Sequence, residues 1–285
     1  MGKPKVVEEL PPVTNHKGVQ IFFDENTTAN MMRRVNIRDM MELAKKPDPD
    51  GRLLLQEELY RASPNEDIIE TLLASDPERI KKRNPDSGCL PLHIACLNIH
   101  SIDSGILLIL IDAWPDSIKK VDRYGFLPIH KACIANCIGN QPPNLDNITM
   151  IVEAYPDGIG KQSKRGQYPL HCAVESKRPF SQIIDLLIEL GGKWMCNVED
   201  KFKQTPLHKA VTRAGGPEML MIVEALVEHA PMTCKHQDCR GMLPLHWAVS
   251  RKEPVLEMLI ELIECFPFAV LQKDMDGKMP VDRIL

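Results

Sequence analysis

Leu90-Pro91-Leu92-His93 is the first of five copies of one tetrapeptide in this sequence. The later copies are Leu127-Pro128-Ile129-His130, Tyr168-Pro169-Leu170-His171, Thr205-Pro206-Leu207-His208 and Leu243-Pro244-Leu245-His246. Their successive prolines lie 37, 41, 37 and 38 residues apart. Self-similarity at such a period is typical of stacked units that bury their apolar faces against their neighbours. The sequence therefore predicts a repeat array.

A polar turn precedes each of the last four copies. The turns are Asp122-Arg123-Tyr124-Gly125, Ser163-Lys164-Arg165-Gly166, Asp200-Lys201-Phe202-Lys203 and Asp238-Cys239-Arg240-Gly241. Glycine supplies the positive φ of a tight turn, and aspartate bonds to its own backbone there. Proline then suits the first position of a helix, because its φ is fixed and its missing N–H is not needed. We expect a short helix after each turn, with a small residue at Ala95, Ala132, Ala173, Ala210 and Ala248.

A second helix is predicted later in each repeat. In one repeat a single apolar stripe is formed by Ile183, Ile184, Leu186, Leu187 and Leu190. Equivalent stretches occupy residues 106–114, 148–155, 219–228 and 255–265, and residues 137–147 are expected to form a loop. Each repeat is therefore turn, helix, loop and helix, and the predicted fold class is all-α.

These features resemble the ankyrin repeat, whose signature is Asp-x-x-Gly-x-Thr-Pro-Leu-His-x-Ala followed by a second helix. The resemblance implies a solenoid of helix pairs joined by short β-hairpin-like turns. It covers about residues 48–285, in about seven copies of which the first and last are degenerate. Of the residues at the threonine position, only Thr205 is expected to cap its helix and pair with its own His208 through a hydroxyl. The last copy lacks a second helix, so either a half-repeat closes the stack or a longer protein has been cut.

Residues 1–47 form a separate N-terminal segment in this interpretation. Residues 1–20 are charged and proline-rich without periodicity, and we expect disorder there. Residues 31–46 read as a Met-rich helix that caps the first repeat. A partner-binding or membrane-surface helix is the less favoured reading of the same residues.

The composition indicates the cellular compartment and the class of protein. The 285 residues are 44% hydrophobic, with nine cysteines, no Cys-x-x-Cys pair and a net charge of -4. An odd number of dilute cysteines argues against a disulfide framework. We expect an intracellular protein, cytoplasmic or nuclear, that is monomeric and does not insert into membranes.

The histidines of the motif are expected to be structural and not catalytic. The resemblance implies that they form hydrogen bonds between the turn and the adjoining repeat; they are His93, His130, His171, His208 and His246. Cys234, His236 and Cys239 could supply three metal ligands, but a fourth is missing at any usual spacing. We therefore expect no metal, no cofactor and no enzymatic activity.

A partner surface is predicted along the turns and the first helices. Its residues are Arg123, Tyr124, Phe126, Lys164, Arg165, Lys201, Phe202, Arg213, Arg240 and Arg251. The second helices are acidic instead, with the i, i+4 pairs Asp185 and Glu189, Glu224 and Glu228, and Glu257 and Glu261. Basic and aromatic side chains together favour an acidic peptide or protein surface. The function predicted is a protein-binding scaffold or adaptor.

Two alternatives remain open at this point. Nucleic acid would use the same basic and aromatic side chains, but the acidic second helices make it the weaker choice. The array could also be the targeting module of an enzyme whose catalytic part lies elsewhere.

Overall fold

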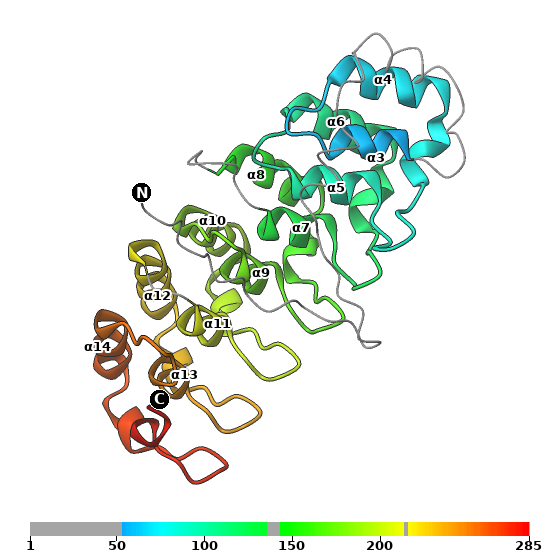
Figure 1. Ribbon diagram of the computed structural model, residues 1–285. Coiled ribbons are helices and arrows are strands. Elements are labelled where there is room, and N and C mark those ends of the chain that lie inside the picture. Colours follow the sequence, from blue (N-terminus) through cyan, green and yellow to red (C-terminus); the bar gives the residue numbers. More distant parts are fainter. Residues whose placement is uncertain (1–52, 136–142, 214–215, 285) are drawn as a thin grey trace, which may run out of the picture. The chain divides into compact units, whose positions relative to one another are not determined.

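The computed structural model describes residues 53–135, 143–213 and 216–284, which belong to one compact unit. Within these residues the chain forms consecutive helix pairs and no strand, as Figure 1 shows. The all-α repeat architecture predicted from the tetrapeptide is therefore confirmed. The expectations for residues 1–47 lie outside the described residues.

The first helices are short, and each of them after the first begins at the motif proline. They are α3 (Leu54–Leu59), α5 (Pro91–Leu97), α7 (Pro128–Ile134), α9 (Pro169–Glu175), α11 (Pro206–Thr212) and α13 (Pro244–Val249). From α5 onwards the residue before the proline has extended backbone angles, which the proline ring favours. Each helix therefore starts at a position fixed by the sequence. The seventh copy begins in the same way with a single 3₁₀ turn, η7 (Pro280–Arg283).

The second helices are longer and carry the apolar stripes. They are α4 (Glu66–Ser75), α6 (Ser104–Ala113), α8 (Leu145–Ala154), α10 (Ser181–Gly191), α12 (Pro217–His229) and α14 (Leu256–Cys265). The prediction of a loop over residues 137–147 is wrong for the last residues of that range. There α8 starts at Leu145, because the Asn144 side chain accepts a hydrogen bond from the N–H of Asn147 and caps the helix.

A 3₁₀ turn follows each second helix, and this element was not predicted. The turns are η1 (Pro77–Lys81), η2 (Pro115–Lys119), η3 (Pro156–Gly160), η4 (Lys193–Asn197), η5 (Pro231–Lys235) and η6 (Pro267–Leu271). In five of them a proline in the first position ends the preceding α-helix and starts the tighter turn. Aromatic residues occupy three of the C-cap positions between helix and turn: Trp114, Tyr155 and Phe266.

The repeats stack by pairing like elements. The first helices contact one another in the order α3, α5, α7, α9, α11, α13 and η7, while α10 contacts both α8 and α12. The alanines at the fixed position of the first helices are 0–3% exposed, so small side chains line the contact between adjacent first helices. Cys96, Cys133 and Cys172 are buried beside them, and burial raises the pKa of each thiol. They are core residues.

Candidate partner-binding surface

Each turn between repeats is built around one polar side chain. Asp200 Oδ1 accepts hydrogen bonds from the N–H groups of Phe202 (2.8 Å) and Gln204 (2.9 Å). Asp122, Asp238 and Asp274 accept equivalent pairs of bonds in their own turns. Because these bonds hold both sides of the turn, the two residues at its tip are presented in a fixed conformation.

The tips are joined to one another by backbone hydrogen bonds. The N–H of Lys164 donates to the carbonyl of Tyr124 (3.0 Å), and the N–H of Lys201 donates to the carbonyl of Arg165 (3.1 Å). The same bond links Arg123 to Ser87, Cys239 to Phe202 and Met275 to Arg240. The tips thus form a continuous row, which we call the tip ladder. Its side chains stand on a connected backbone rather than on separate loops.

Most of the predicted partner residues are exposed on this ladder. The side chains of Tyr124 and Phe202 are 54% and 55% exposed. The exposed cations are Arg123, Lys164, Arg165, Lys201 and Arg240. None of these five cations forms an ion pair with a carboxylate in the described part of the chain. The ladder therefore presents basic and aromatic groups to solvent.

Three of the predicted partner residues are less accessible than expected. Phe126 is half-buried, because its ring lies between Lys131 (Nζ 4.8 Å from the ring centroid) and His130 (centroids 5.6 Å apart). Arg213 is half-buried and donates from Nη1 to the carbonyl of Glu175 at 3.1 Å. Arg251 is also half-buried. These side chains flank the exposed tips.

The repeated geometry agrees with one family of proteins. A family model for ankyrin repeats, in three copies, matches residues 182–267. The chain contains ankyrin repeats. Ankyrin repeats are generally protein-interaction modules and are typically non-enzymatic. A comparison with curated proteins found no match.

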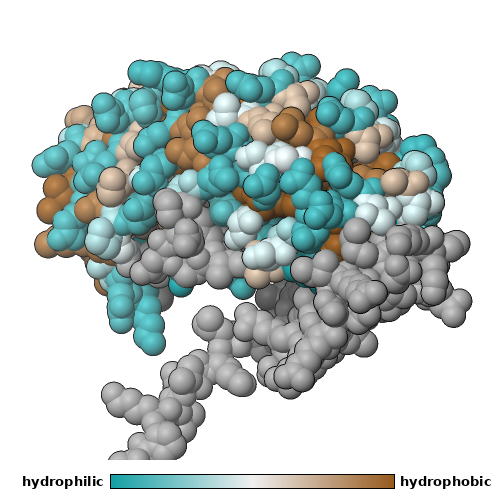
Figure 2. All heavy atoms as spheres, turned by 90° about the horizontal axis from the view of Figure 1, so that it is seen from above, coloured by the Kyte–Doolittle hydropathy of each residue, from teal (hydrophilic) through white to brown (hydrophobic). Residues whose placement is uncertain are grey.

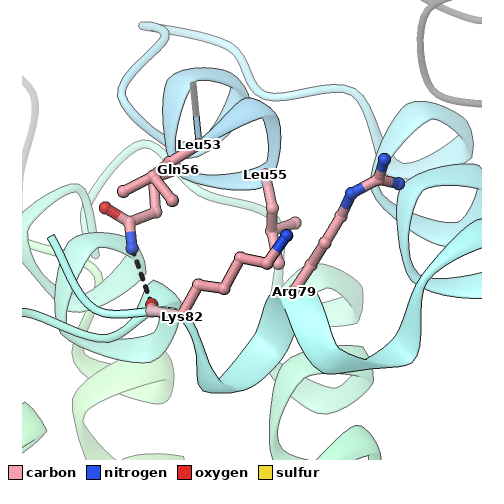
Figure 3. Close-up of a pocket in the computed structure, with 5 residues that line it drawn as sticks. All are labelled: Leu53, Leu55, Gln56, Arg79 and Lys82. Carbon is pink, nitrogen blue, oxygen red and sulfur yellow. Dashed lines mark hydrogen bonds between the residues drawn. The ribbon is translucent and has the colours of Figure 1, made fainter. Parts of the chain in front are cut away.

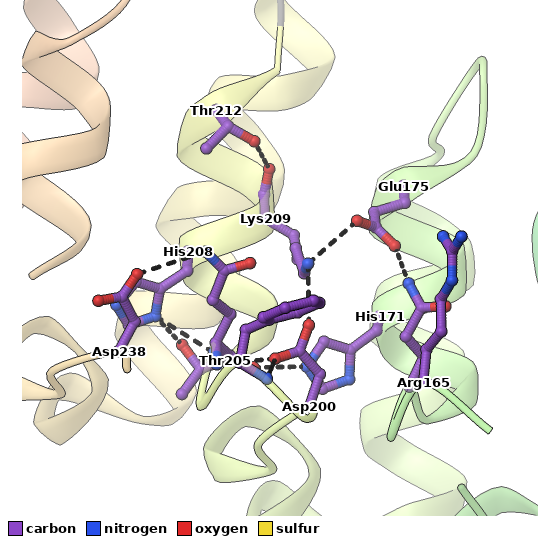
Figure 4. Close-up of polar contacts among 12 residues, drawn as sticks. Arg165, His171, Glu175, Asp200, Thr205, His208, Lys209, Thr212 and Asp238 are labelled. Carbon is purple, nitrogen blue, oxygen red and sulfur yellow. Dashed lines mark hydrogen bonds and ion pairs between the residues drawn. The ribbon is translucent and has the colours of Figure 1, made fainter. Parts of the chain in front are cut away.

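The histidines of the ankyrin motif join each repeat to the next. His171 is fully buried; Nδ1 accepts the N–H of Tyr168 (3.3 Å) and Nε2 lies 2.9 Å from the carbonyl of Gln204. Because Nδ1 accepts a hydrogen bond, it carries no proton; the single ring proton is on Nε2, which donates it to the carbonyl, and the ring is neutral. His93, His130, His208 and His246 make the same two contacts. In the one copy with threonine, the Thr205 hydroxyl pairs with His208 Nδ1 at 2.9 Å, as expected (Figure 4).

Burial keeps these rings uncharged. Desolvation lowers the pKa of His93, His130, His171 and His208 to about 4, although the hydrogen bond to the next repeat acts in the opposite direction. The pKa of His246 is lowered for the same reason. Each ring is neutral and buried, and both of its nitrogens form hydrogen bonds. It therefore holds the backbone in place and has no free nitrogen for proton transfer.

Two lysines beneath the ladder, of which Lys131 is buried and Lys209 is half-buried, were not predicted as contacts of the turn aspartates. Lys209 Nζ lies 2.9 Å from Asp200 Oδ2 and 3.4 Å from Glu175 Oε1, as Figure 4 shows. Lys131 Nζ lies 2.7 Å from Asp122 Oδ2 in the same way. The donor stands nine residues after the turn aspartate, and Trp247 and Arg283 fill this position for Asp238 and Asp274. That spacing is the sequence signal that could have revealed the contact.

The three residues considered as metal ligands from the sequence differ in their surroundings. His236 Nε2 lies 3.1 Å from Glu199 Oε1, while Cys234 is buried and Cys239 is exposed. In the described part of the chain, no group of three histidine, cysteine or carboxylate side chains is arranged to hold a metal. None of the helices described there is long and apolar enough to cross a membrane.

A small pocket lies between α3 and η1 (Figure 3). It is lined by Leu53, Leu55, Gln56, Arg79 and Lys82, and these side chains leave no enclosed space for a water molecule. Gln56 Nε2 donates to the carbonyl of Lys82 at 2.9 Å across its wall. Ligand pockets usually enclose about 300–1,000 Å³. This hollow is a packing gap between the two elements.

Proposed function

We propose that this ankyrin repeat protein is a non-enzymatic scaffold or adaptor that binds an acidic segment of a protein partner along the tip ladder. The ladder residues in contact are taken to be Arg123, Tyr124, Lys164, Arg165, Lys201, Phe202 and Arg240. Phe126, Arg213 and Arg251 flank this contact and support it. The proposal places the protein in the cytoplasm or nucleus as a monomer, in keeping with the unpaired thiols of its described cysteines.

The observation that carries the proposal is the agreement in charge along connected tips. Exposed cations on neighbouring tips repel one another, so an anionic partner is favoured. Glu175 on α9 is an acidic residue of the same predicted surface, but it is half-buried and already bound to Lys209 and Gln167. It therefore neutralises little of the ladder's charge.

The aromatic residues give the surface a second kind of contact. At the second tip position the ladder reads Tyr124, Arg165, Phe202 and Arg240, so aromatic and basic residues alternate from one repeat to the next. Exposed aromatic side chains and arginine are the residues most enriched at binding hot spots. We expect a partner in which apolar and acidic residues alternate in the same order.

The spacing of the tips sets the register of such a partner. One step of the ladder combines a Cα–Cα step within a tip with a hydrogen-bonded step between tips, which together measure about 9 Å. An extended peptide covers this distance in about three residues. An acidic residue three positions after an apolar one would therefore meet Arg165 when the apolar residue meets Tyr124.

The test uses surface plasmon resonance with synthetic peptides as probes. The probes carry tyrosine or leucine and aspartate alternating every third residue, and their sequence-scrambled forms serve as reference. Lys164→Glu combined with Arg165→Glu is expected to slow association about tenfold or more, because charge steers encounter. Phe202→Ala is expected to speed dissociation instead, because a desolvated aromatic anchors the complex.

A matched control separates the effect of the ladder residues from the effect of the protein's net charge. Lys119→Glu combined with Lys193→Glu changes two exposed lysines on η2 and η4 and should leave both rates unchanged. Equal loss of binding in both charge-reversal variants would contradict the proposal. Tighter binding of single-stranded nucleic acid than of any acidic peptide would assign the ladder to the alternative partner.

A further inference from the structure

A second row of exposed residues runs along the 3₁₀ turns, separate from the tip ladder. The second residue of each turn occupies the same place in every repeat. In η1, η2 and η3 it is acidic, and the residues are Glu78, Asp116 and Asp157. In η4, η5 and η6 it is large and apolar, and the residues are Trp194, Met232 and Phe268. We call these six positions the helix-end row.

The apolar half of the row is open to solvent. Trp194, Met232 and Phe268 are 50%, 65% and 67% exposed. Trp194 and Met232 belong to repeats that have a successor packed against them, so their exposure is not a consequence of the array ending. Large apolar side chains exposed at the same position of three consecutive repeats form a patch of the kind that marks interaction sites. Figure 2 shows how hydrophobic side chains reach the surface between hydrophilic ones on one face of the molecule.

The acidic half of the row holds unneutralised carboxylates. Asp116 and Asp157 are exposed and form no ion pair within the described residues, whereas Glu78 pairs with Lys81 at 2.7 Å. One turn before each of the unpaired residues stands another exposed acid, Asp112 or Glu153. The lysines beside them lie over aromatic rings: Lys119 over Tyr155 and Lys120 over Trp114, both at 5.9 Å. The carboxylates are therefore available to an external cation.

We propose that the helix-end row is a second docking site, for a basic amphipathic segment of a protein. Apolar side chains of that segment would cover Trp194, Met232 and Phe268. Lysine or arginine at one of its ends would meet the carboxylates of η2 and η3. Charge complementarity fixes the polarity of the partner, because the row is acidic at one end and apolar at the other. Such a site, opposite in charge to the tip ladder, would let one scaffold hold two different partners.

The same charges argue against a membrane as the occupant. Exposed tryptophan, methionine and phenylalanine could enter a lipid interface, but the carboxylates of the row and the acidic faces of α10, α12 and α14 would be repelled by anionic headgroups. A protein segment satisfies both halves of the row. Neighbouring helices pack about 8–10 Å apart, so a bound helix would need one apolar anchor about every six or seven residues.

The experiment selects peptides from a phage-displayed library of random 20-residue sequences against the full chain. Clones whose binding is lost with Lys164→Glu and Arg165→Glu are removed, because they report on the tip ladder. The remaining peptides are expected to carry apolar residues six or seven positions apart and basic residues near one end. Trp194→Ser combined with Met232→Ser should lower the affinity of these peptides at least about tenfold. Asp116→Lys combined with Asp157→Lys should also lower their affinity, and this loss should become smaller as the salt concentration is raised.

Matched surface variants provide the control. Met221→Ser removes a methionine that is 51% exposed on α12 but outside the row, and Glu224→Lys reverses an exposed acid there. Neither change should alter binding. The inference is overturned if no peptide with this pattern is enriched, or if the enriched peptides bind the Trp194 and Met232 variant as well as the unmodified chain. Because these clones do not use the tip ladder, either outcome leaves the proposed function standing.

Discussion

Replacing Gly166 with alanine tests the contact between neighbouring tips. Gly166 has a φ of +76°, and a Cβ placed there would lie 2.6 Å from the backbone nitrogen of Lys201 and 3.1 Å from the carbonyl carbon of Asp200. Both atoms belong to the backbone of the next turn, so neither can rotate away. The next tip would have to move, which would break the bond from the Lys201 N–H to the Arg165 carbonyl.

The expected loss of stability has three parts. An L-residue in the left-handed region costs about 1–2 kcal/mol, the lost hydrogen bond about 1 kcal/mol, and the steric displacement about another 1 kcal/mol. The free energy of unfolding should therefore fall by about 3–4 kcal/mol. Gly277→Ala is the matched control, because Gly277 has the same φ of +76° but no atom within 4 Å of the added Cβ. Its cost is limited to the backbone term of about 1–2 kcal/mol.

Urea denaturation followed by far-ultraviolet circular dichroism measures both variants. The reasoning requires Gly166→Ala to lose about 2 kcal/mol more than Gly277→Ala. Equal losses in the two variants would mean that the tips are not in backbone contact, and the tip ladder would have to be abandoned.

Three further predictions concern the groups beneath the ladder. His171→Ala should lower the free energy of unfolding by about 2 kcal/mol, because the Tyr168 N–H loses its acceptor; urea denaturation should show little effect of the control His229→Ala. Acidification should destabilise the array between pH 6.5 and 4, because the folded-state pKa of the buried histidines is about 4 and the unfolded chain therefore binds more protons in this window. The free energy of unfolding from urea denaturation should fall by up to about 1.4 kcal/mol per pH unit for each histidine. A flat pH profile would contradict their burial. Lys209→Met should cost about 2 kcal/mol by leaving Asp200 Oδ2 unpaired, whereas Lys201→Met on the exposed tip should change the melting temperature little.

The fold could be predicted because its signals are local and repeat in register. Proline at the start of a helix, glycine in a turn and a small residue at the helix contact act within a few residues of one another. The 3₁₀ turns were not predicted, because the proline that follows five of the six second helices indicates from the sequence only that a helix ends. That proline also starts a tighter turn, whose second residue forms the helix-end row.

The candidate surface was predicted less completely, because accessibility depends on contacts between repeats. Phe126 reads as an exposed aromatic residue in the sequence, yet its ring is covered by Lys131 from the following helix. Lys209 reads as a surface lysine, yet it is held by Asp200 and by Glu175, which belongs to the preceding repeat. The tip residues themselves were predicted correctly as exposed because the turn that carries them projects from the helices.

Chemical-shift mapping of a bound acidic peptide on the ¹⁵N-labelled chain tests the proposed partner site most directly. The peptide is the tightest binder among the surface plasmon resonance probes. The proposal requires the largest amide shifts at the tips, at Tyr124, Arg165 and Phe202, with smaller shifts at Arg213 and Arg251. Largest shifts on the second helices α10, α12 and α14, with the tips unmoved, would contradict it.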